Sequence, residues 1–267
     1  MQAQLNIALQ AGRKAAEFIY QNMDRLEQHQ IEQKSANDFV TLVDKKSEKI
    51  ITDALLKAFP EHHILGEESG AVNTNNASDF QWIIDPLDGT TNFIFGIPHF
   101  AVSIALLHKG RLEVGVVIDV AKREEFTARR GGGATLNGRR IRVRNSQSLT
   151  NTLLATGIPF GAKTRDEPAN RYFADLQKLT NDTAGIRRMG AAALDLAYVA
   201  AGRVDGYWES GVQAWDVAAG ALLVQEAGGL VSDYHGGQGF LKSNNIVAGS
   251  PKVFKGILSC VGNSAER

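Results

Sequence analysis

The sequence predicts a layered α/β fold, in which helices and sheets alternate through the thickness of the protein. Three observations lead to this prediction. Two stretches with helical spacing of apolar residues open the chain, short extended runs fill its middle, and helical and extended patterns alternate from about residue 168 onward. The chain has 267 residues, 43% of them hydrophobic. A chain of this length buries roughly 73% of its unfolded surface, so its core needs no disulfides.

The first half of the chain predicts two helices followed by a sheet. Apolar residues recur at helical spacing over residues 5–19 and 43–58, and Pro60 ends the second pattern. Extended runs follow, and two turn signals, Lys109-Gly110 and Asn137-Gly138, join four of them into hairpins. The runs are 64–66, 82–84, 101–107 with 112–120, and 126–129 with 140–143.

The second half alternates between the two patterns. The expected elements are a helix ending at Thr180, a helix over 191–202, a strand over 204–209, a helix over 217–227, and strands over 230–233 and 246–248. The polar stretch 144–151 lacks periodicity, but it is not rich in Pro, Gly or Ser. We therefore expect two sub-domains, 1–145 and 146–267, that share one body.

Composition excludes several classes of protein. Twenty-nine basic and 29 acidic residues cancel, so no overall field attracts nucleic acid or an anionic membrane. The single cysteine, Cys260, forbids an internal disulfide, and the histidines show no zinc-ligand spacing, which fits a reducing cytoplasm. The best apolar run, 100–107, is far below the ~18 residues of a membrane-spanning helix, and no export signal is apparent.

The segment 82–92, WIIDPLDGTTN, carries the strongest chemical signal. A strand pattern runs directly into two carboxylates, Asp85 and Asp88, and Pro86 fixes the turn between them. Gly89 and Thr90 follow, where backbone N–H groups and hydroxyls at a turn or helix start bind anions. Carboxylates for a hard cation thus adjoin donors for a phosphate. An ordinary strand-end turn explains the spacing alone about equally well.

Three other acidic residues give weaker signals. Glu67 follows the run 64–66, where a solvated turn is the common interpretation. Asp216 precedes the helix expected at 217–227, and in isolation an N-cap role is favoured over a ligand role. Glu209 stands at the end of an expected strand, where a carboxylate is usually solvated.

Together these segments carry a family resemblance. GEE at 66–68, DPLDGTTN at 85–92 and WDVAAG at 215–220 resemble, in order and spacing, three signatures of the inositol monophosphatase family, and the similarity covers nearly the whole chain. Segments 157–160, 195–206 and 226–232 most resemble its bacterial SuhB-type branch. The resemblance implies alternating α-β-α-β-α layers of the inositol monophosphatase and fructose-1,6-bisphosphatase type.

The same resemblance implies an activity. It is that of a Mg²⁺-dependent, lithium-sensitive phosphomonoesterase that hydrolyses myo-inositol monophosphates, in the form of a homodimer. Sugar bisphosphates and nucleotide 3′-phosphates are alternative substrates within the superfamily. The resemblance is highly specific for the superfamily and only weakly specific for the substrate.

It also implies two or three Mg²⁺ ions per active site. The first would be held by Glu67, Asp85 and the Leu87 carbonyl, and the second by Asp85, Asp88 and Asp216. Oxygen ligands without a Cys/His cluster suit a hard cation, and two cations would clamp a phosphoryl group from both sides. The implied catalytic residues are Glu67 and the pair Thr90 and Asp44. The alternative for Asp44 is a solvated residue in the first turn of a helix.

The resemblance further implies a set of substrate contacts. These are Leu87, Asp88, Gly89, Thr90, Arg187, Gly190, Ala191, Ala192, Glu209 and Asp216. Many relatives carry Ser or Thr in place of Ala191, so we expect backbone rather than hydroxyl contacts there. Glu209 would accept from ring hydroxyls of the substrate. Lys34 matches a mobile catalytic-loop position, and a solvated lysine in a loop is the alternative.

A basic patch motivates a different class of function. Arg140, Arg142 and Arg144 alternate onto one face of an expected strand, which usually marks a solvated edge that blocks aggregation. The alternative is an accessory factor that binds RNA or the transcription machinery. The glycines at 131–133 precede a hairpin rather than a helix, so a nucleotide-binding loop is not expected.

Overall fold

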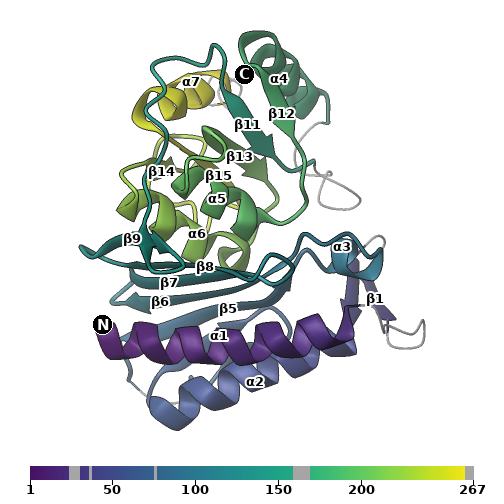
Figure 1. The fold of residues 1–267 in the computed structure, drawn as a ribbon, viewed down its shortest axis with the longest axis vertical. Coiled ribbons are helices and arrows are strands. Elements are labelled where there is room, and N and C mark those ends of the chain that lie inside the picture. The colour runs from purple at the N-terminus through teal and green to yellow at the C-terminus, as the bar shows by residue number, and fades with distance from the viewer. Residues whose placement is uncertain (24–30, 36–37, 75–76, 159–168, 262–267) are drawn as a thin grey trace.

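The computed structural model describes residues 1–23, 31–35, 38–74, 77–158 and 169–261. Five layers stack in the order helices, sheet, helices, sheet, helices (Figure 1). The expected α-β-α-β-α architecture is therefore confirmed. No helix within the described ranges has the length and apolar character that a membrane span requires.

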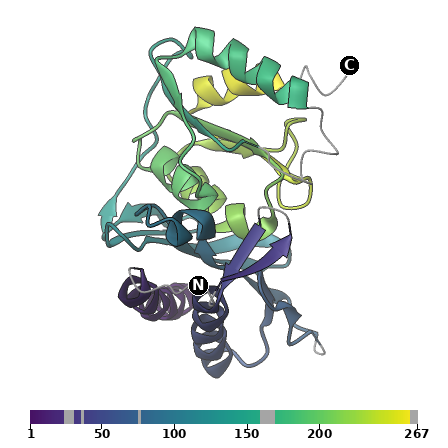
Figure 2. The same ribbon diagram turned by 90° about the vertical axis from the view of Figure 1, so that its right-hand side faces the viewer.

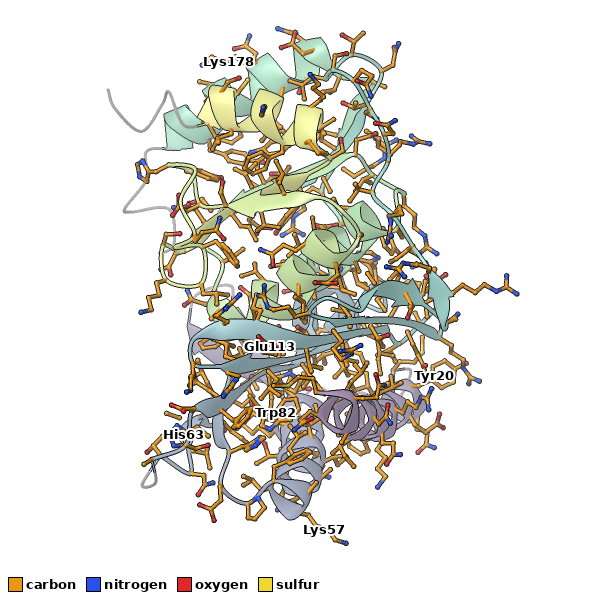
Figure 3. All side chains as sticks on the ribbon, turned by 90° about the vertical axis from the view of Figure 1, so that its left-hand side faces the viewer. Tyr20, Lys57, His63, Trp82, Glu113 and Lys178 are labelled. Carbon is orange, nitrogen blue, oxygen red and sulfur yellow. The ribbon has the colours of Figure 1, made fainter. Side chains whose placement is uncertain are left out.

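The first layer consists of the two N-terminal helices, α1 (Gln2–Asn22) and α2 (Leu42–Ala58). Their apolar faces are buried against the first sheet because the 3.6-residue period places those residues on one side. Trp82 of the first sheet lies fully buried in the core that the sheet shares with these helices, whereas Lys57 projects outward from α2 (Figure 3). Both periodic segments predicted from the sequence are thus helices.

The first sheet has eight strands in the order β10-β9-β8-β7-β6-β5-β3-β4. Only β3 and β5 are parallel. Its strands are β3 (His63–Gly66), β4 (Gly70–Val72), β5 (Phe80–Asp88), β6 (Ala101–His108), β7 (Arg111–Asp119), β8 (Glu124–Arg129), β9 (Gly133–Leu136) and β10 (Arg139–Arg140). The central strands are nearly continuous apolar runs because helices cover both faces. The hairpin at Lys109-Gly110 is confirmed, with φ of 52° and 74°.

The second expected hairpin is partly wrong. Asn137 and Gly138 do form a tight turn, but it joins β9 to β10 instead of joining 126–129 to 140–143. The glycines at 131–133 make an additional turn, so that β8 pairs with β9. The carboxylate of Glu226 accepts from the N–H groups of Gly131 and Gly133, at 2.8 Å each, which fixes that turn. The glycine run therefore has a structural role.

The arginine patch does not lie on one strand. Strand β10 contains Arg140 and ends there, whereas Arg142 and Arg144 follow in irregular backbone. All three arginines are exposed, because the intervening Ile141 and Val143 pack against the core. The alternation predicted from the sequence is thus produced by core packing and not by a strand.

The second sheet has five strands in the order β12-β11-β13-β15-β14. The strands are β11 (Leu153–Thr156), β12 (Gly185–Arg187), β13 (Gly206–Ser210), β14 (Leu230–Ser232) and β15 (Asn245–Gly249). Helices α5 (Ala192–Ala200) and α6 (Ala214–Glu226) lie between the two sheets, and α4 (Ala169–Asp182) and α7 (Pro251–Val261) cover the outer face (Figure 2). Helix α6 begins three residues earlier than expected.

One apolar core lies at the centre of the protein and joins the two sheets through the helices between them. It contains residues of the first sheet, such as Val117 and Phe126, together with Leu196 and Leu222 of the central helices and Ala248 of the second sheet. Because α5 and α6 are sandwiched between sheets, they are apolar on every side. The division into sub-domains 1–145 and 146–267 stays a prediction.

Several elements have no counterpart among the predicted ones. They are the hairpin of β1 (Ile31–Ser35) and β2 (Asp38–Thr41), strands β4, β9, β11 and β12, and helices α3 (Thr90–Ile94) and α7. Lys34 lies in β1 and not in a loop, and its side chain lies outside the described part of the structure. Most of these elements are short, so their periodicity is weak. Helix α7 is the exception, because its buried residues Val253, Phe254, Ile257 and Val261 do recur at helical spacing.

Candidate active site

Asp85 and Asp88 lie at the carboxyl end of strand β5, inside the first sheet. The β5–β6 ladder shifts register between these two residues, where Pro86 has no N–H to donate. The Asp85 carboxylate accepts from the Leu87 N–H at 3.0 Å, which closes a tight turn. Both carboxylates are buried, at 1% and 9% exposure. An ordinary solvated turn is therefore not what the sequence produces here.

The neighbouring carboxylates act on one another. Burial raises the pKa of Asp85 well above its usual value, and the charges of Glu67, Asp88 and Asp216 raise it further. Burial likewise raises the pKa of Asp88, with contributions from Asp216, Glu209 and Glu67. Five acidic residues from the β3–β4 turn, β5, β13 and α6 thus share one region. These carboxylates stay ionised there only if a cation offsets their charge; otherwise some of them take up protons.

The donors in this region fit a hard cation, although the ligand shell is not closed. Within the described ranges, no three His, Cys, Asp or Glu side chains are already grouped as a metal-binding set. The available ligand atoms are all oxygens, which hard cations prefer. Asp85 and Asp88 are buried next to other carboxylates, which raises their pKa values, and a divalent cation would relieve the repulsion between these charges. The residues present therefore suit Mg²⁺ in chemistry.

Asp44 is connected to Thr90 across 46 residues of sequence. Asp44 is the third residue of α2, fully buried, and forms a capping box with Thr41. Its Oδ2 accepts from Thr41 N at 2.8 Å and Thr41 Oγ1 at 2.6 Å, and its Oδ1 lies 2.9 Å from Thr90 Oγ1. The solvated alternative for Asp44 is therefore wrong.

The Thr90 hydroxyl has two acceptors within reach. Its oxygen lies 2.9 Å from Asp44 Oδ1 and 3.0 Å from the Leu87 carbonyl, and it has a single proton to donate. Burial raises the pKa of Asp44, and its hydrogen bonds oppose that rise. Asp44 is thus positioned to orient the hydroxyl and to receive a proton through it.

Asp216 is not the N-cap of its helix. The N-cap of α6 is Gln213, and Asp216 is the third helical residue. Its Oδ2 accepts from Gln213 N at 2.7 Å, in a capping box like that of Asp44. The helix starts early because Ala214 and Trp215 pack against the core. One carboxylate oxygen thus serves the helix, and the charge acts on Asp85 and Asp88.

The start of α5 faces the same region. The Ala193 N–H donates to Asp88 Oδ2 at 2.7 Å, so Asp88 satisfies one of the unpaired N–H groups of that helix. Gly190, just before the helix, has φ +87°, and a Cβ there would lie 2.6 Å from Arg188 Nη1. Ala191 and Ala192 are buried. Close backbone approach at this turn therefore depends on Gly190.

Glu209 differs from expectation, whereas the substrate or subunit contact expected of Arg187 stays a prediction. Glu209 is half-buried, accepts from the Tyr207 hydroxyl at 2.5 Å, and fills the space beside Gly157, so a freely solvated strand end is wrong. Arg187 is exposed and donates to the Ile186 carbonyl at 3.1 Å. The neighbouring Arg188 reaches over Gly190, and its charge partly opposes the rise in the pKa of Asp195 that burial and the charges of Glu209 and Asp88 cause.

Sequence reasoning missed Asn92 and Asp195. The buried Asn92 amide donates to the His99 carbonyl at 2.8 Å and to the Met189 carbonyl at 2.9 Å, and Met189 lies 97 residues further along the chain than Asn92. Asp195 is 1% exposed, and its Oδ1 accepts no hydrogen bond from the residues that the structure describes. A lone carboxylate in the apolar run 192–200 was the available signal for Asp195.

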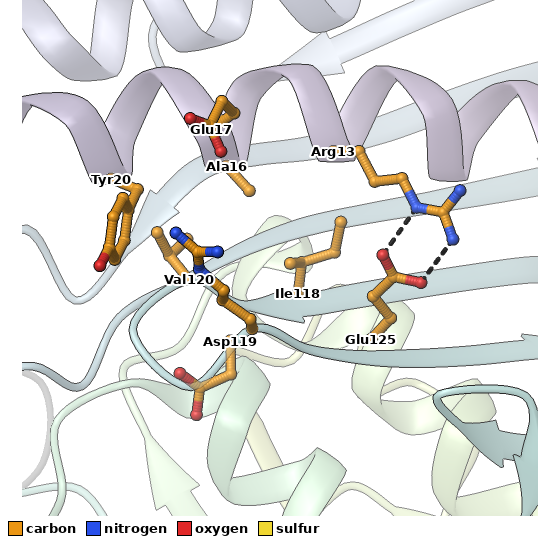
Figure 4. Close-up of a pocket in the computed structure, with 9 residues that line it drawn as sticks. Arg13, Ala16, Glu17, Tyr20, Ile118, Asp119, Val120 and Glu125 are labelled. Carbon is orange, nitrogen blue, oxygen red and sulfur yellow. Dashed lines mark hydrogen bonds and ion pairs between the residues drawn. The ribbon is translucent and has the colours of Figure 1, made fainter.

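A pocket of about 200 Å³ lies elsewhere, between α1 and the ends of β7 and β8 (Figure 4). Arg13 pairs there with Glu125 at 2.6 Å, and Arg123 stacks 4.5 Å from the centre of the Tyr20 ring. Its lining residues include none of the residues predicted for the site. Arg13 is thus paired with a carboxylate and Arg123 with an aromatic ring. We therefore take the acidic region at the end of β5, and not this pocket, as the candidate site.

Comparisons with known proteins identify the family of this chain. The model of the inositol monophosphatase family matches residues 1–264. A Pseudomonas aeruginosa protein named Nus factor SuhB is 55% identical over 262 residues, which cover 98% of this chain and 96% of that protein. The extragenic suppressor protein suhB of Bartonella henselae has a TM-score of 0.90 and 42% identity, covering 97% of this chain and 98% of that one.

An inositol monophosphatase from Anabaena gives a TM-score of 0.86 with 39% identity, over 98% of this chain and 96% of that one. The family is one of phosphatases that generally depend on a metal ion. Sequence and fold thus match over nearly the whole length, and the chain belongs to the inositol monophosphatase family.

Proposed function

We propose that the protein is a Mg²⁺-dependent, lithium-sensitive phosphomonoesterase that hydrolyses myo-inositol monophosphates to inositol and phosphate. The observation that carries this proposal is the buried acidic region around Asp85 and Asp88, next to the Thr90 hydroxyl held by Asp44. An acidic region of this kind repels a phosphate unless cations neutralise it. Family membership supports the phosphatase activity.

The metal ligands are part of the proposal. Glu67, Asp85 and the Leu87 carbonyl would hold one Mg²⁺, and Asp85, Asp88 and Asp216 another, with two or three ions per site. Bound Mg²⁺ would offset the carboxylate charges and polarise the phosphoryl group for in-line attack by water. Glu67 is the least buried of the first set, so its orientation depends on its neighbours.

Asp44 and Thr90 would act as the base. The Asp44 carboxylate accepts the Thr90 proton, which leaves a lone pair of the hydroxyl oxygen directed at the attacking water. The proton of the water passes to the hydroxyl oxygen as the hydroxyl proton passes to Asp44. Burial of Asp44 supports this role, because its raised pKa favours proton uptake.

The substrate contacts are proposed from the same geometry. Backbone groups at Gly89 and at Gly190, Ala191 and Ala192 would contact the phosphate or a hydroxyl group, and Glu209 would accept from a ring hydroxyl. For Arg187, whose side chain is exposed, a contact with substrate or with a second subunit stays a prediction, as do the homodimer and the cytoplasmic location.

The test is release of inorganic phosphate from a panel of monoesters. We expect release from inositol monophosphates with Mg²⁺, none with a chelator present, and inhibition by millimolar lithium. Faster release from a sugar bisphosphate or a nucleotide 3′-phosphate would identify one of the alternative substrates. Absence of metal-dependent release from every monoester would refute the enzymatic proposal.

A second candidate function is that of an accessory factor for transcription. Its support is the name Nus factor carried by relatives and the exposed Arg140, Arg142 and Arg144. Replacing all three by Ala should abolish salt-sensitive binding of RNA or RNA polymerase and leave phosphate release intact. If the unaltered protein binds neither, the arginines have no role in such binding, and Arg144 serves only the protein's own surface, where its Nη1 lies 3.8 Å from Asp205 Oδ2.

A further inference from the structure

Helix α2 presents a row of polar side chains to the candidate site. Asp44, Ser47 and Glu48 are all buried, and because Ser47 and Glu48 follow Asp44 by three and four residues, both lie beside it on the helix surface. Asp44 holds Thr90, and Ser47 Oγ lies 3.4 Å from the Pro86 carbonyl. Glu48, 4% exposed, is the member of this row to which the proposed mechanism gives no role.

The Glu48 carboxylate holds the turn that carries Glu67. Its Oε2 accepts from the Glu68 N–H at 2.9 Å, and its Oε1 accepts from the Ser69 N–H at 2.8 Å. On the other side, the Glu67 N–H donates to the Ile84 carbonyl of β5 at 3.1 Å. The backbone at Glu67 is thus fixed on both sides, by the sheet and by Glu48.

The glycine at position 66 belongs to the same arrangement. A Cβ on Gly66 would lie 2.5 to 2.8 Å from the three carboxyl atoms of Glu48, closer than non-bonded atoms approach. The carboxylate therefore occupies the space that any side chain at position 66 would need. Gly66 is required because Glu48 reaches across it to the two N–H groups.

We propose that Glu48 is a positioning residue that sets the affinity of the site for a divalent cation by fixing the orientation of Glu67. The inference rests on the proposed function, in which Glu67 is a metal ligand. Both carboxylate oxygens of Glu48 are used by backbone donors, so an amide cannot replace it: one half would accept, and the NH₂ would face an N–H.

The test is calorimetric titration of the metal-free protein with Mg²⁺, paired with kinetics of phosphate release. Loss of a group that orients a ligand typically weakens metal binding about 10- to 100-fold, and we expect Glu48→Gln to do so. Gly66→Ala displaces the carboxylate without changing its charge and should give the same result. Asp53→Asn, on the exposed side of the same helix, should leave Mg²⁺ affinity unchanged. At saturating Mg²⁺, kcat of Glu48→Gln should return to within about threefold of wild type, since the catalytic groups are intact.

A double variant shows whether Glu48 acts through Glu67. In a Glu67→Gln background, Glu48→Gln should weaken Mg²⁺ binding no further, because the group that it positions is already lost. An equal further loss would overturn the inference. So would unchanged Mg²⁺ affinity in Glu48→Gln with a lower melting temperature, which would make the contact purely structural. If the wild-type protein binds no Mg²⁺, the proposed function fails and this inference with it.

Discussion

Replacing Asp44 by Asn changes the direction of one hydrogen bond and little else. The amide oxygen can take the place of Oδ2 and keep both bonds from Thr41. The NH₂ group then faces Thr90 Oγ1, where the carboxylate was an acceptor. The hydroxyl is forced to accept from Asn and to donate to the Leu87 carbonyl at 3.0 Å. The amide uses one of the two lone pairs of the hydroxyl oxygen, and it cannot take up the proton that an attacking water would pass through that hydroxyl.

The magnitudes separate catalysis from stability. Three hydrogen bonds remain, and the raised pKa of Asp44 means that the fold disfavours its charge, so removing the charge costs little. We expect the melting temperature to change by no more than about 4 °C, or about 1 kcal/mol, in the stabilising direction if at all. Loss of a general base lowers kcat about 10²- to 10⁴-fold, which is roughly 3 to 5 kcal/mol of barrier.

The assay is steady-state phosphate release at saturating Mg²⁺, with thermal melts of the same preparations. KM should change far less than kcat, because the pair acts on the water and not on the substrate. Thr90→Ala should resemble Asp44→Asn, whereas Thr90→Ser keeps the hydroxyl and should retain most activity. If kcat of Asp44→Asn stays within about threefold of wild type, the pair is not the base.

Three further predictions follow from individual contacts. Asp216→Asn keeps the capping bond from the Gln213 N–H, so the melting temperature of the metal-free protein should be unchanged or slightly higher, while the Mg²⁺ concentration needed for activity rises steeply. Full activity at limiting Mg²⁺ would remove Asp216 from the ligand set. Asn92→Ala loses two buried hydrogen bonds at about 1 kcal/mol each, which should lower the melting temperature by about 4 to 8 °C. Asn92→Asp should lower it further, because a carboxylate cannot donate to either carbonyl. A melting temperature equal to that of wild type would contradict this prediction. Burial and the charges of Glu209 and Asp88 raise the pKa of Asp195, so in chelator its contribution to stability is present at acid pH and lost as pH rises through that pKa. Asp195→Asn should therefore melt at a higher temperature than wild type at pH 8, and the difference should shrink toward pH 4. A difference in melting temperature that does not depend on pH would exclude titration of Asp195 as its cause.

Much of the fold follows from local sequence patterns. The periodicity of residues 5–19 and 43–58 predicts α1 and α2 because each helix has one apolar face. Turn chemistry locates the residues with positive φ at Lys109-Gly110 and Asn137-Gly138. It does not identify the strand that follows, because pairing depends on the whole sheet, and the glycine run at 131–133 redirects β8 to β9.

The residue types alone indicate the chemistry of the candidate site: carboxylates and a carbonyl for a hard cation, at the end of an apolar strand. Which carboxylates are buried together, and which groups hold them, depends on how the layers pack. Asp44 meets Thr90 over 46 residues, Glu48 meets Ser69 over 21, and Asn92 meets Met189 over 97. A local pattern records whether a residue suits a helix, a strand or a turn, but the partner of a buried polar group is chosen by packing between layers. Burial then makes an unpaired polar group costly, so each of these contacts is fixed once the layers have formed.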